Sequence, residues 1–180
     1  MSKQMSPRRT PANPVQEALV RWVSGTGPGQ ATGRWLSRII ALPQLRRLTT
    51  DAIPWSPLQR PLQEATVALV TTSGVHLRDD HPFVLASDAT FRVIPRTAEA
   101  DDLAITHQAY DRTDALRDIN LVFPLQRLRE LEAEGVIGRV ADLHYGFGLV
   151  GQAAELVAPG QEIGRRLKRD QVDLALFVPA

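Results

Sequence analysis

The chain has 180 residues, which is enough for one domain with a sizeable hydrophobic core. Its 43% hydrophobic and 23% charged residues are ordinary for a soluble globular protein, and a formal net charge of +1 argues against a nucleic-acid-binding surface. The absence of cysteine excludes disulfides and thiolate metal sites from the sequence itself, and no apolar run approaches the length of a membrane span. The expected setting is therefore the cytoplasm, without contact with a membrane.

The first 64 residues are predicted to lie outside the main domain. Residues 1–14 are rich in Pro, Ser and Arg, a composition typical of a disordered tail. Residues 15–50 are the predicted N-terminal helical extension, because apolar side chains recur at helical spacing in 15–23 and 33–48 around a glycine-rich break. Such apolar stripes are expected to pack on the domain or on a second subunit. The prolines of residues 51–64 predict an extended linker.

Residues 65–180 carry the predicted α/β domain. Apolar runs alternate there with helical patterns, which predicts a doubly wound, mainly parallel sheet. Three uninterrupted apolar runs are expected to be buried parallel strands of this one sheet: residues 66–75, 103–106 and 172–178. Among the helical patterns, Pro124 suits the first position of a helix that Gly135 ends.

Polar side chains follow several of the apolar runs. His76 lies in the turn after the first run, while His107, Tyr110 and Asp111 follow the second. His144 also comes at the end of an apolar segment. Because the carboxyl ends of parallel strands line the ligand crevice of an open sheet, we expect the three histidines to gather at that edge.

Short motifs occur in order from about Ile53 to the C-terminus. They are IPWSPL (53–58), VALVTTSGVH (67–76), FRVIP (91–95), HQAYDR (107–112), DINLVFP (118–124) and HYGF (144–147). Together they resemble the selenoprotein B family of the glycine, sarcosine, betaine and D-proline reductases, and the short D-proline reductase type is nearest in size. The first fifty residues lie outside this resemblance.

The resemblance implies an oxidoreductase that reductively cleaves a carbon–nitrogen bond of an amino-acid-like substrate. Family members use a selenocysteine or cysteine, followed closely by another cysteine, just after a strand similar to residues 172–178. The sequence stops at Ala180, so no redox residue is expected in the chain itself. We expect the selenocysteine or cysteine pair immediately after Ala180, with its UGA codon read as a stop in a truncated reading of a longer selenoprotein.

Such chemistry needs a nucleophile of low pKa, a proton donor for the leaving amine and a partner for the substrate carboxylate. The candidate catalytic residues are His107, Tyr110, Asp111 and His144, and the candidate substrate-binding residues are His76, Arg112 and Asn120. No metal ligands are assigned, because the histidines lack the local spacing of a helical metalloprotease site.

Other interpretations remain for the same residues. His76 also suits the cap of a turn, and Arg112 suits a surface ion pair with Asp114. A second hypothesis for the whole chain is a non-catalytic interaction or regulatory domain with residues 33–48 as its partner surface, and a third is a metal-dependent enzyme on the same fold. For the reductase, the expected partners are a small amino-acid-like substrate, a thiol electron donor, and a second copy or partner subunit.

Overall fold

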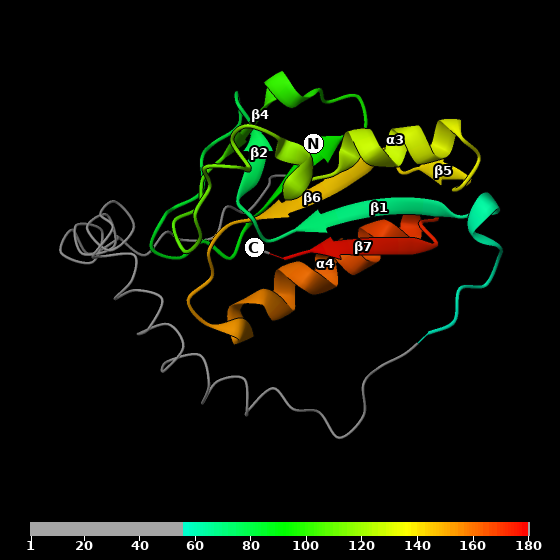
Figure 1. The fold of residues 1–180 in the computed structure, drawn as a ribbon. Coiled ribbons are helices and arrows are strands. Elements are labelled where there is room, and N and C mark those ends of the chain that lie inside the picture. Colours follow the sequence, from blue (N-terminus) through cyan, green and yellow to red (C-terminus); the bar gives the residue numbers. More distant parts are fainter. Residues whose placement is uncertain (1–55, 180) are drawn as a thin grey trace.

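Strand β1, Thr66–Thr71, lies at the centre of the computed structural model, which describes residues 56–179 (Figure 1). Every residue of β1 after Thr66 is buried, as its run of Val, Ala and Leu side chains predicts. On one side β1 pairs along its length with β7, Leu174–Val178. On the other side it pairs with β5, Arg139–Val140, and then with β6, Leu143–Phe147. All three pairings are parallel.

Two further pairings are antiparallel. Strand β3, Phe91–Pro95, runs antiparallel to β6 and extends the main sheet. Strands β2, Val75–Leu77, and β4, Leu103–Ile105, form a separate two-stranded sheet. The domain therefore contains a mixed sheet rather than a purely parallel one.

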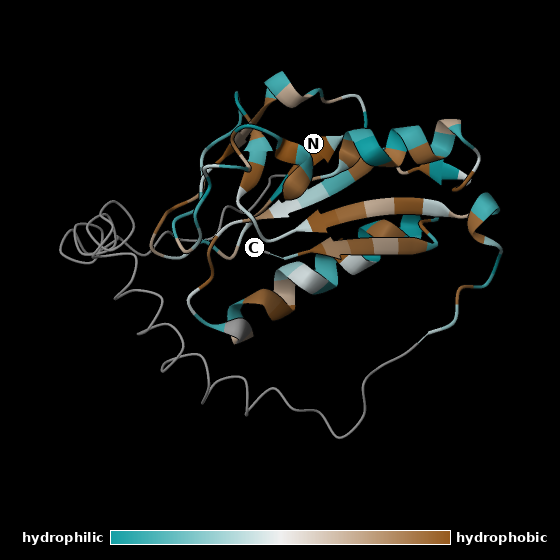
Figure 2. Cartoon of the chain, viewed as in Figure 1, coloured by the Kyte–Doolittle hydropathy of each residue, from teal (hydrophilic) through white to brown (hydrophobic). Residues whose placement is uncertain are grey.

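Helices cover the main sheet on both faces (Figure 1). Helix α3, Leu125–Ala133, packs with Val67 and Leu69 of β1 in the larger apolar cluster. Helix α4, Val157–Arg169, packs through Ile163 with Val70 in the smaller cluster on the opposite face. Figure 2 shows the apolar character concentrated on the strands and polar residues on much of α3. Neither α-helix in this range is long or apolar enough to cross a lipid bilayer.

Short 3-10 helices fill the connections. They are η1, Leu62–Glu64; η2, Ala100–Asp102; η3, Ile119–Leu121; and η4, Ala153–Leu156. Pro124 lies just before the first residue of α3, and Gly135, with a φ of 69°, follows its end. The predicted helix is therefore confirmed, but Pro124 is its N-cap rather than its first residue, and Gly135 takes the left-handed C-terminal position that suits glycine.

The α/β class is confirmed, but the predictions for two of the three expected strands are wrong. Residues 103–106 do not join the main sheet, because β4 pairs only with β2 in the described chain. Residues 172–178 are not a buried strand: β7 lies at the edge, with Leu174, Leu176 and Phe177 exposed. The doubly wound arrangement stays a prediction. The tail over 1–14, the helical extension over 15–50 and the first part of the linker lie outside the described residues.

The first apolar run is also shorter than predicted, because β1 ends at Thr71 and β2 begins at Val75. Gly74 separates them with a φ of 74°, a left-handed conformation that side chains other than glycine rarely adopt. A Cβ on Gly74 would lie 2.2 Å from the carbonyl oxygen of Thr106. Only glycine therefore fits this turn without displacing the backbone of another segment.

We predict that Gly74→Ala lowers the free energy of unfolding by at least about 2 kcal/mol, through the left-handed backbone and the clash with Thr106. Urea denaturation followed by circular dichroism measures this change. Gly160→Ala is the matched control, because a Cβ at Gly160 of α4 meets nothing within 4 Å. That variant is expected to be neutral, or more stable by up to about 1 kcal/mol. Equal stability of the two variants would contradict the assignment.

Candidate functional site

The turn over residues 72–74 brings the carboxyl ends of three parallel strands together. Thr72 N–H donates to the carbonyl of Val178 at the end of β7 (3.2 Å), and Gly74 N–H donates to that of Phe147 at the end of β6 (2.7 Å). The Gly74 carbonyl accepts from Thr106 N–H (2.8 Å), which adds the segment after β4. We call this meeting point the carboxyl edge. Its position corresponds to that of the ligand crevice in open α/β sheets.

Two fully buried hydroxyl groups stabilise this edge from within. The oxygens of Thr71 and Ser73 lie 2.9 Å apart, and Thr71 Oγ1 lies 2.9 Å from the carbonyl oxygen of Val122. Since a hydroxyl has one proton, the consistent arrangement is that Ser73 donates to Thr71 and Thr71 donates to Val122. The relay attaches the segment before α3 to the end of β1.

Tyr110 and His107 lie against the same turn. The Tyr110 hydroxyl donates to the carbonyl oxygen of Ser73 over 3.0 Å. The rings of His107 and Tyr110 have centroids 5.0 Å apart. Two of the predicted catalytic residues are therefore adjacent, and both lie beside the turn that contacts the end of β7.

Burial sets the protonation of this pair. Burial, and next the positive charge of Arg112, lowers the pKa of His107 to about 4. Burial raises the pKa of Tyr110 above its ordinary value. His107 Nδ1 accepts from the Ala109 N–H (3.2 Å), so the neutral ring carries its proton on Nε2. At neutral pH both side chains are uncharged hydrogen-bond donors, and His107 is no imidazolium acid.

Arg112 and Asp111 extend this cluster along the same loop. Arg112 donates from Nη1 to the carbonyl of Ile105 (3.2 Å), which positions its charge near His107. Asp114 pairs instead with Arg117, so the alternative surface pair between Arg112 and Asp114 is not formed. Asp111 Oδ1 accepts from both the backbone N–H and the hydroxyl of Thr113, which shapes the turn after Tyr110.

His76 lies behind this cluster on β2. Its Nδ1 lies 2.6 Å from the Leu77 carbonyl and its Nε2 lies 2.9 Å from the Thr106 hydroxyl. The carbonyl can only accept, so Nδ1 carries the proton and Thr106 donates to Nε2. Both ring nitrogens are thus occupied, and the ring packs edge-on against Phe83 with centroids 5.8 Å apart. His76 supports the loop after β4 rather than presenting a free nitrogen.

The loop over residues 78–90 is fixed above His76 by Arg92. The Arg92 guanidinium donates to the His81 carbonyl (2.8 Å) and to Thr90 Oγ1 (2.7 Å). It also lies 4.4 Å from the centre of the Phe83 ring. The loop reaches the carboxyl edge, because the Leu85 carbonyl accepts from the side-chain amide of Gln108.

His144 and Asn120 lie apart from the cluster. His144 is the second residue of β6, is fully buried, and accepts on Nδ1 from the Leu69 N–H (3.0 Å). Its ring packs edge-on to Phe123 inside the domain, away from the end of β6. Asn120 donates to Asp118 Oδ1 (2.9 Å) and Gln126 Oε1 (3.3 Å) at the start of α3. Neither residue is brought into contact with His107 or Tyr110 by any of these interactions.

Thr71 and Ser73 are the site residues that sequence reasoning missed. Their signal was available, since a buried apolar strand ending in Thr-Thr-Ser-Gly places hydroxyls at a crevice edge. What no pattern shows is that Val122, about fifty positions later, would accept the Thr71 hydrogen bond. The partner of a buried hydroxyl is a tertiary property.

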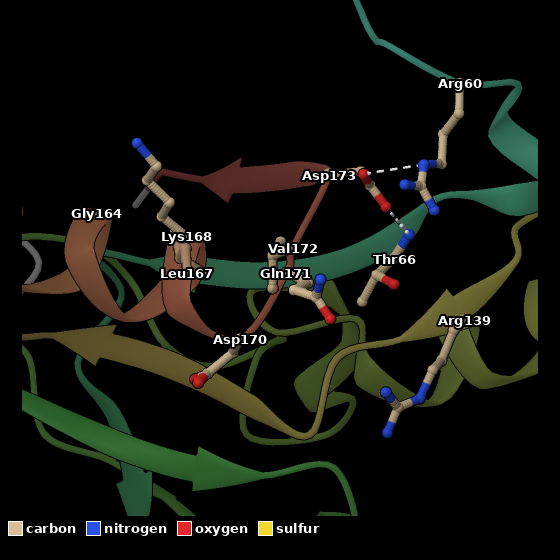
Figure 3. Close-up of a pocket in the computed structure, with 10 residues that line it drawn as sticks. All are labelled: Arg60, Thr66, Arg139, Gly164, Leu167, Lys168, Asp170, Gln171, Val172 and Asp173. Carbon is tan, nitrogen blue, oxygen red and sulfur yellow. Dashed lines mark hydrogen bonds and ion pairs between the residues drawn. The ribbon is translucent and has the colours of Figure 1, made fainter.

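A cavity of about 460 Å³ lies at the opposite edge of the sheet, where β1, β5 and β7 begin (Figure 3). Arg60 pairs there with Asp173 at 3.2 Å, and Asp173 Oδ2 accepts from the Thr66 N–H at 2.9 Å. Arg139 pairs with Asp142. The Arg60–Asp173 pair joins the segment before β1 to the start of β7. Within residues 56–179, no three His, Asp or Glu side chains are grouped as metal ligands.

We predict that Thr71→Val lowers the free energy of unfolding by about 1–3 kcal/mol, because the Val122 carbonyl and the Ser73 hydroxyl lose their partner. Thr71→Ser keeps the hydroxyl and is expected to recover most of this loss. Thermal and urea unfolding measure both variants. If Thr71→Val is as stable as Thr71→Ser, the hydroxyl relay makes no net contribution and the interpretation is wrong.

We predict that the buried His144 makes the free energy of unfolding depend on pH. Burial, followed by the charges of Arg129 and Arg96, lowers its pKa to about 4 from about 6.5. The unfolded chain binds this proton more readily, so the stabilisation is complete above pH 6.5 and is lost as the pH falls towards 4. The urea midpoint of the natural protein should therefore fall as the pH is lowered from 6.5 to 4. The midpoint of His144→Leu should fall less steeply over the same range. His81→Gln changes an exposed side chain and should keep the original slope; the same slope in all three proteins would contradict the prediction.

The comparisons with known proteins agree on one family. Residues 44–179 match the family described as glycine/sarcosine/betaine reductase selenoprotein B. The chain is 42% identical over 125 residues to the D-proline reductase subunit gamma of Acetoanaerobium sticklandii, covering 68% of this chain and 52% of that protein. It is 34% identical over 135 residues to the glycine reductase complex component B subunit gamma of Symbiobacterium thermophilum, covering 71% and 31%.

A third relative is the sarcosine reductase complex component B subunit beta of Peptoclostridium acidaminophilum, 36% identical over 97 residues, with 51% and 22% covered. The matched region thus spans about half, or less, of the length of these relatives. No solved structure matches the chain. The family match covers most of the sequence, and the chain belongs to the glycine/sarcosine/betaine reductase selenoprotein B family.

Proposed function

We propose that this chain provides the substrate site of a reductase that cleaves a carbon–nitrogen bond in an amino-acid-like compound, with a selenol or thiol that lies outside residues 1–180. The observation that carries the proposal is the hydrogen bond from Thr72 N–H to the Val178 carbonyl. It places the end of β7 beside the turn whose Ser73 carbonyl binds Tyr110. In the family that the chain resembles, the redox residue follows this strand.

The roles at the carboxyl edge follow from protonation. Attack of a selenolate or thiolate on carbon forms a carbon–selenium or carbon–sulfur bond as the carbon–nitrogen bond breaks, and the departing nitrogen takes the electron pair and needs a proton. A second thiol then attacks the selenium or sulfur, which releases the reduced carbon to take a proton and leaves a selenenyl sulfide or disulfide. Tyr110 is protonated at neutral pH because burial raises its pKa. His107, neutral with its proton on Nε2, is the second donor. We assign the proton transfer to Tyr110, whose hydroxyl proton leaves the Ser73 carbonyl for the departing nitrogen, and the orientation of the substrate nitrogen to His107.

The substrate carboxylate is assigned to Arg112. Its guanidinium lies in the same loop as His107 and Tyr110 and uses one nitrogen, Nη1, for the Ile105 carbonyl. A planar guanidinium has further donors that suit a carboxylate. His76 and Asp111 support this loop through Thr106 and Thr113, and His144 and Asn120, which lie apart from it, are assigned no contact with the substrate.

The relatives are named as subunits of D-proline reductase and of multi-component glycine and sarcosine reductases. This supports a role for the present chain as one subunit of a reductase complex. The thiol electron donor is then expected on a partner. Glycine, sarcosine and D-proline define the substrate class to test first, since the names of the relatives contain them.

The binding half of this proposal can be tested on the chain alone. Titration with D-proline, followed by amide NMR, should shift the resonances of Thr72 and Arg112 at the carboxyl edge. Arg112→Gln should weaken binding roughly tenfold, the loss expected when a carboxylate loses a charged hydrogen-bond partner. Arg117→Gln is the matched control, because Arg117 is an exposed arginine of the same loop paired with Asp114.

Glycine and sarcosine are titrated in the same way. Binding of any of the three compounds at the carboxyl edge, lost in Arg112→Gln and kept in Arg117→Gln, supports the proposal. Shifts confined to the cavity at the opposite edge, or equal losses in the two variants, would contradict it. Absence of binding by all three compounds would favour the non-catalytic hypothesis for this fold.

A further inference from the structure

The outer edge of β7 is uncovered in the described structure. β7 pairs with β1, and no other strand within residues 56–179 pairs with it. Leu174, Leu176 and Phe177 are 39%, 40% and 68% exposed. The strand sequence LALFV contains no charge and no proline, the features that usually protect an exposed edge. Figure 2 shows this strand as mostly apolar. Such a surface is expected to be covered in solution.

The register with β1 divides these side chains between the two faces. Leu174 and Leu176 lie opposite Val67 and Leu69, which pack on the α3 face. Phe177 lies opposite Val70, which packs on the α4 face. On the α3 face, α3 packs over β5, on the other side of β1 from β7 (Figure 1). Leu174 and Leu176 therefore form an apolar strip that no described helix covers.

The chain that precedes β1 is attached at the start of this strip. Arg60 pairs with Asp173 over 3.2 Å, and Asp173 directly precedes Leu174 (Figure 3). Asp173 also accepts from Thr66 N–H, and its own N–H donates to the Thr66 carbonyl. The segment leading out of the structure towards residue 1 thus begins beside β7.

The sequence before this attachment contains an apolar stripe of matching size. Residues 33–48 place Trp35, Leu36, Ile39 and Ile40 on one face of the predicted helix. Eleven residues lie between position 48 and Arg60, and an extended chain of that length spans up to about 40 Å. The five residues of β7 cover about 17 Å. The linker is therefore long enough to bring the stripe over the whole strand.

We propose that residues 33–48 dock on the α3 face of β7, with Trp35, Ile39 and Ile40 covering Leu174 and Leu176. Attachment through a short linker gives the segment an effective concentration in the millimolar range. A second copy at micromolar concentration competes poorly with it. Since Trp35, Ile39 and Ile40 precede the residues that match the family, this docking does not depend on the proposed reductase function.

Tryptophan fluorescence tests the docking in the full chain. All three tryptophans, Trp22, Trp35 and Trp55, lie in the first 55 residues. In Trp22→Phe/Trp55→Phe the emission reports Trp35 alone. Introducing Leu176→Glu should shift that emission to longer wavelength and increase its quenching by acrylamide severalfold. Leu116→Glu, which changes a leucine that is 66% exposed on another segment, is the matched control and should leave both unchanged.

Cross-linking gives an independent readout, because the natural chain has no cysteine. Ile39→Cys with Leu174→Cys should form an intrachain link with a short bismaleimide, whereas Ile39→Cys with Leu116→Cys should not. Circular dichroism confirms that each variant is folded. Links between chains, detected as dimers on a denaturing gel, would overturn the proposal in favour of a second copy. Unchanged Trp35 emission in folded Leu176→Glu, or a shift produced only by Phe177→Glu, would also overturn it.

Discussion

The hydrogen bonds of Gly74 are the constraint on which this structure depends. Gly74 lies in the turn after β1 with a left-handed backbone conformation. Its N–H donates to the end of β6, and its carbonyl accepts from the segment after β4. The turn thereby connects the main sheet with the small β2–β4 sheet and places Tyr110 against Ser73. A side chain at Gly74 would collide with the backbone of Thr106. The cluster at the carboxyl edge is therefore a consequence of one tight turn.

His107 and His144 are both buried, but they have different roles in hydrogen bonding. His107 and His144 both have pKa values lowered to about 4, mainly by desolvation. His107 packs against Tyr110, whose hydroxyl group donates to the Ser73 carbonyl in the turn after β1. His144 instead accepts a β1 backbone hydrogen bond deep in the sheet. A buried neutral imidazole can thus serve either as a donor to a ligand or as a backbone acceptor, and its surroundings decide which.

The sheet is covered unevenly, and one strand of it is left exposed. β1 is enclosed by α3 on one face and α4 on the other, whereas β7 pairs with no strand but β1 among residues 56–179 and packs through Ala175 with the α4 cluster. The carboxyl end of β7 contacts the candidate site through Thr72. Its start is bound by Arg60 through Asp173. A segment docked on β7 therefore contacts the same strand whose carboxyl end lies at the candidate site.

Much of the local structure was predictable from the sequence. The apolar runs located β1, β4 and β7, and proline and glycine marked the ends of α3, because these signals depend on neighbouring residues alone. The motifs also identified the family, which the match over residues 44–179 confirms. The chain order of polar residues after apolar runs correctly indicated that His107 and Tyr110 belong together.

Only the tertiary structure decided which runs share a sheet and which faces are covered. The pattern of an apolar run is the same for a central strand and an edge strand, so β7 was mistaken for a buried strand and β4 was placed in the wrong sheet. The hydroxyl relay from Ser73 through Thr71 to Val122 depends on segments far apart in the chain. Pairing partners and buried hydrogen bonds are set by packing between distant segments, and no local pattern contains that information.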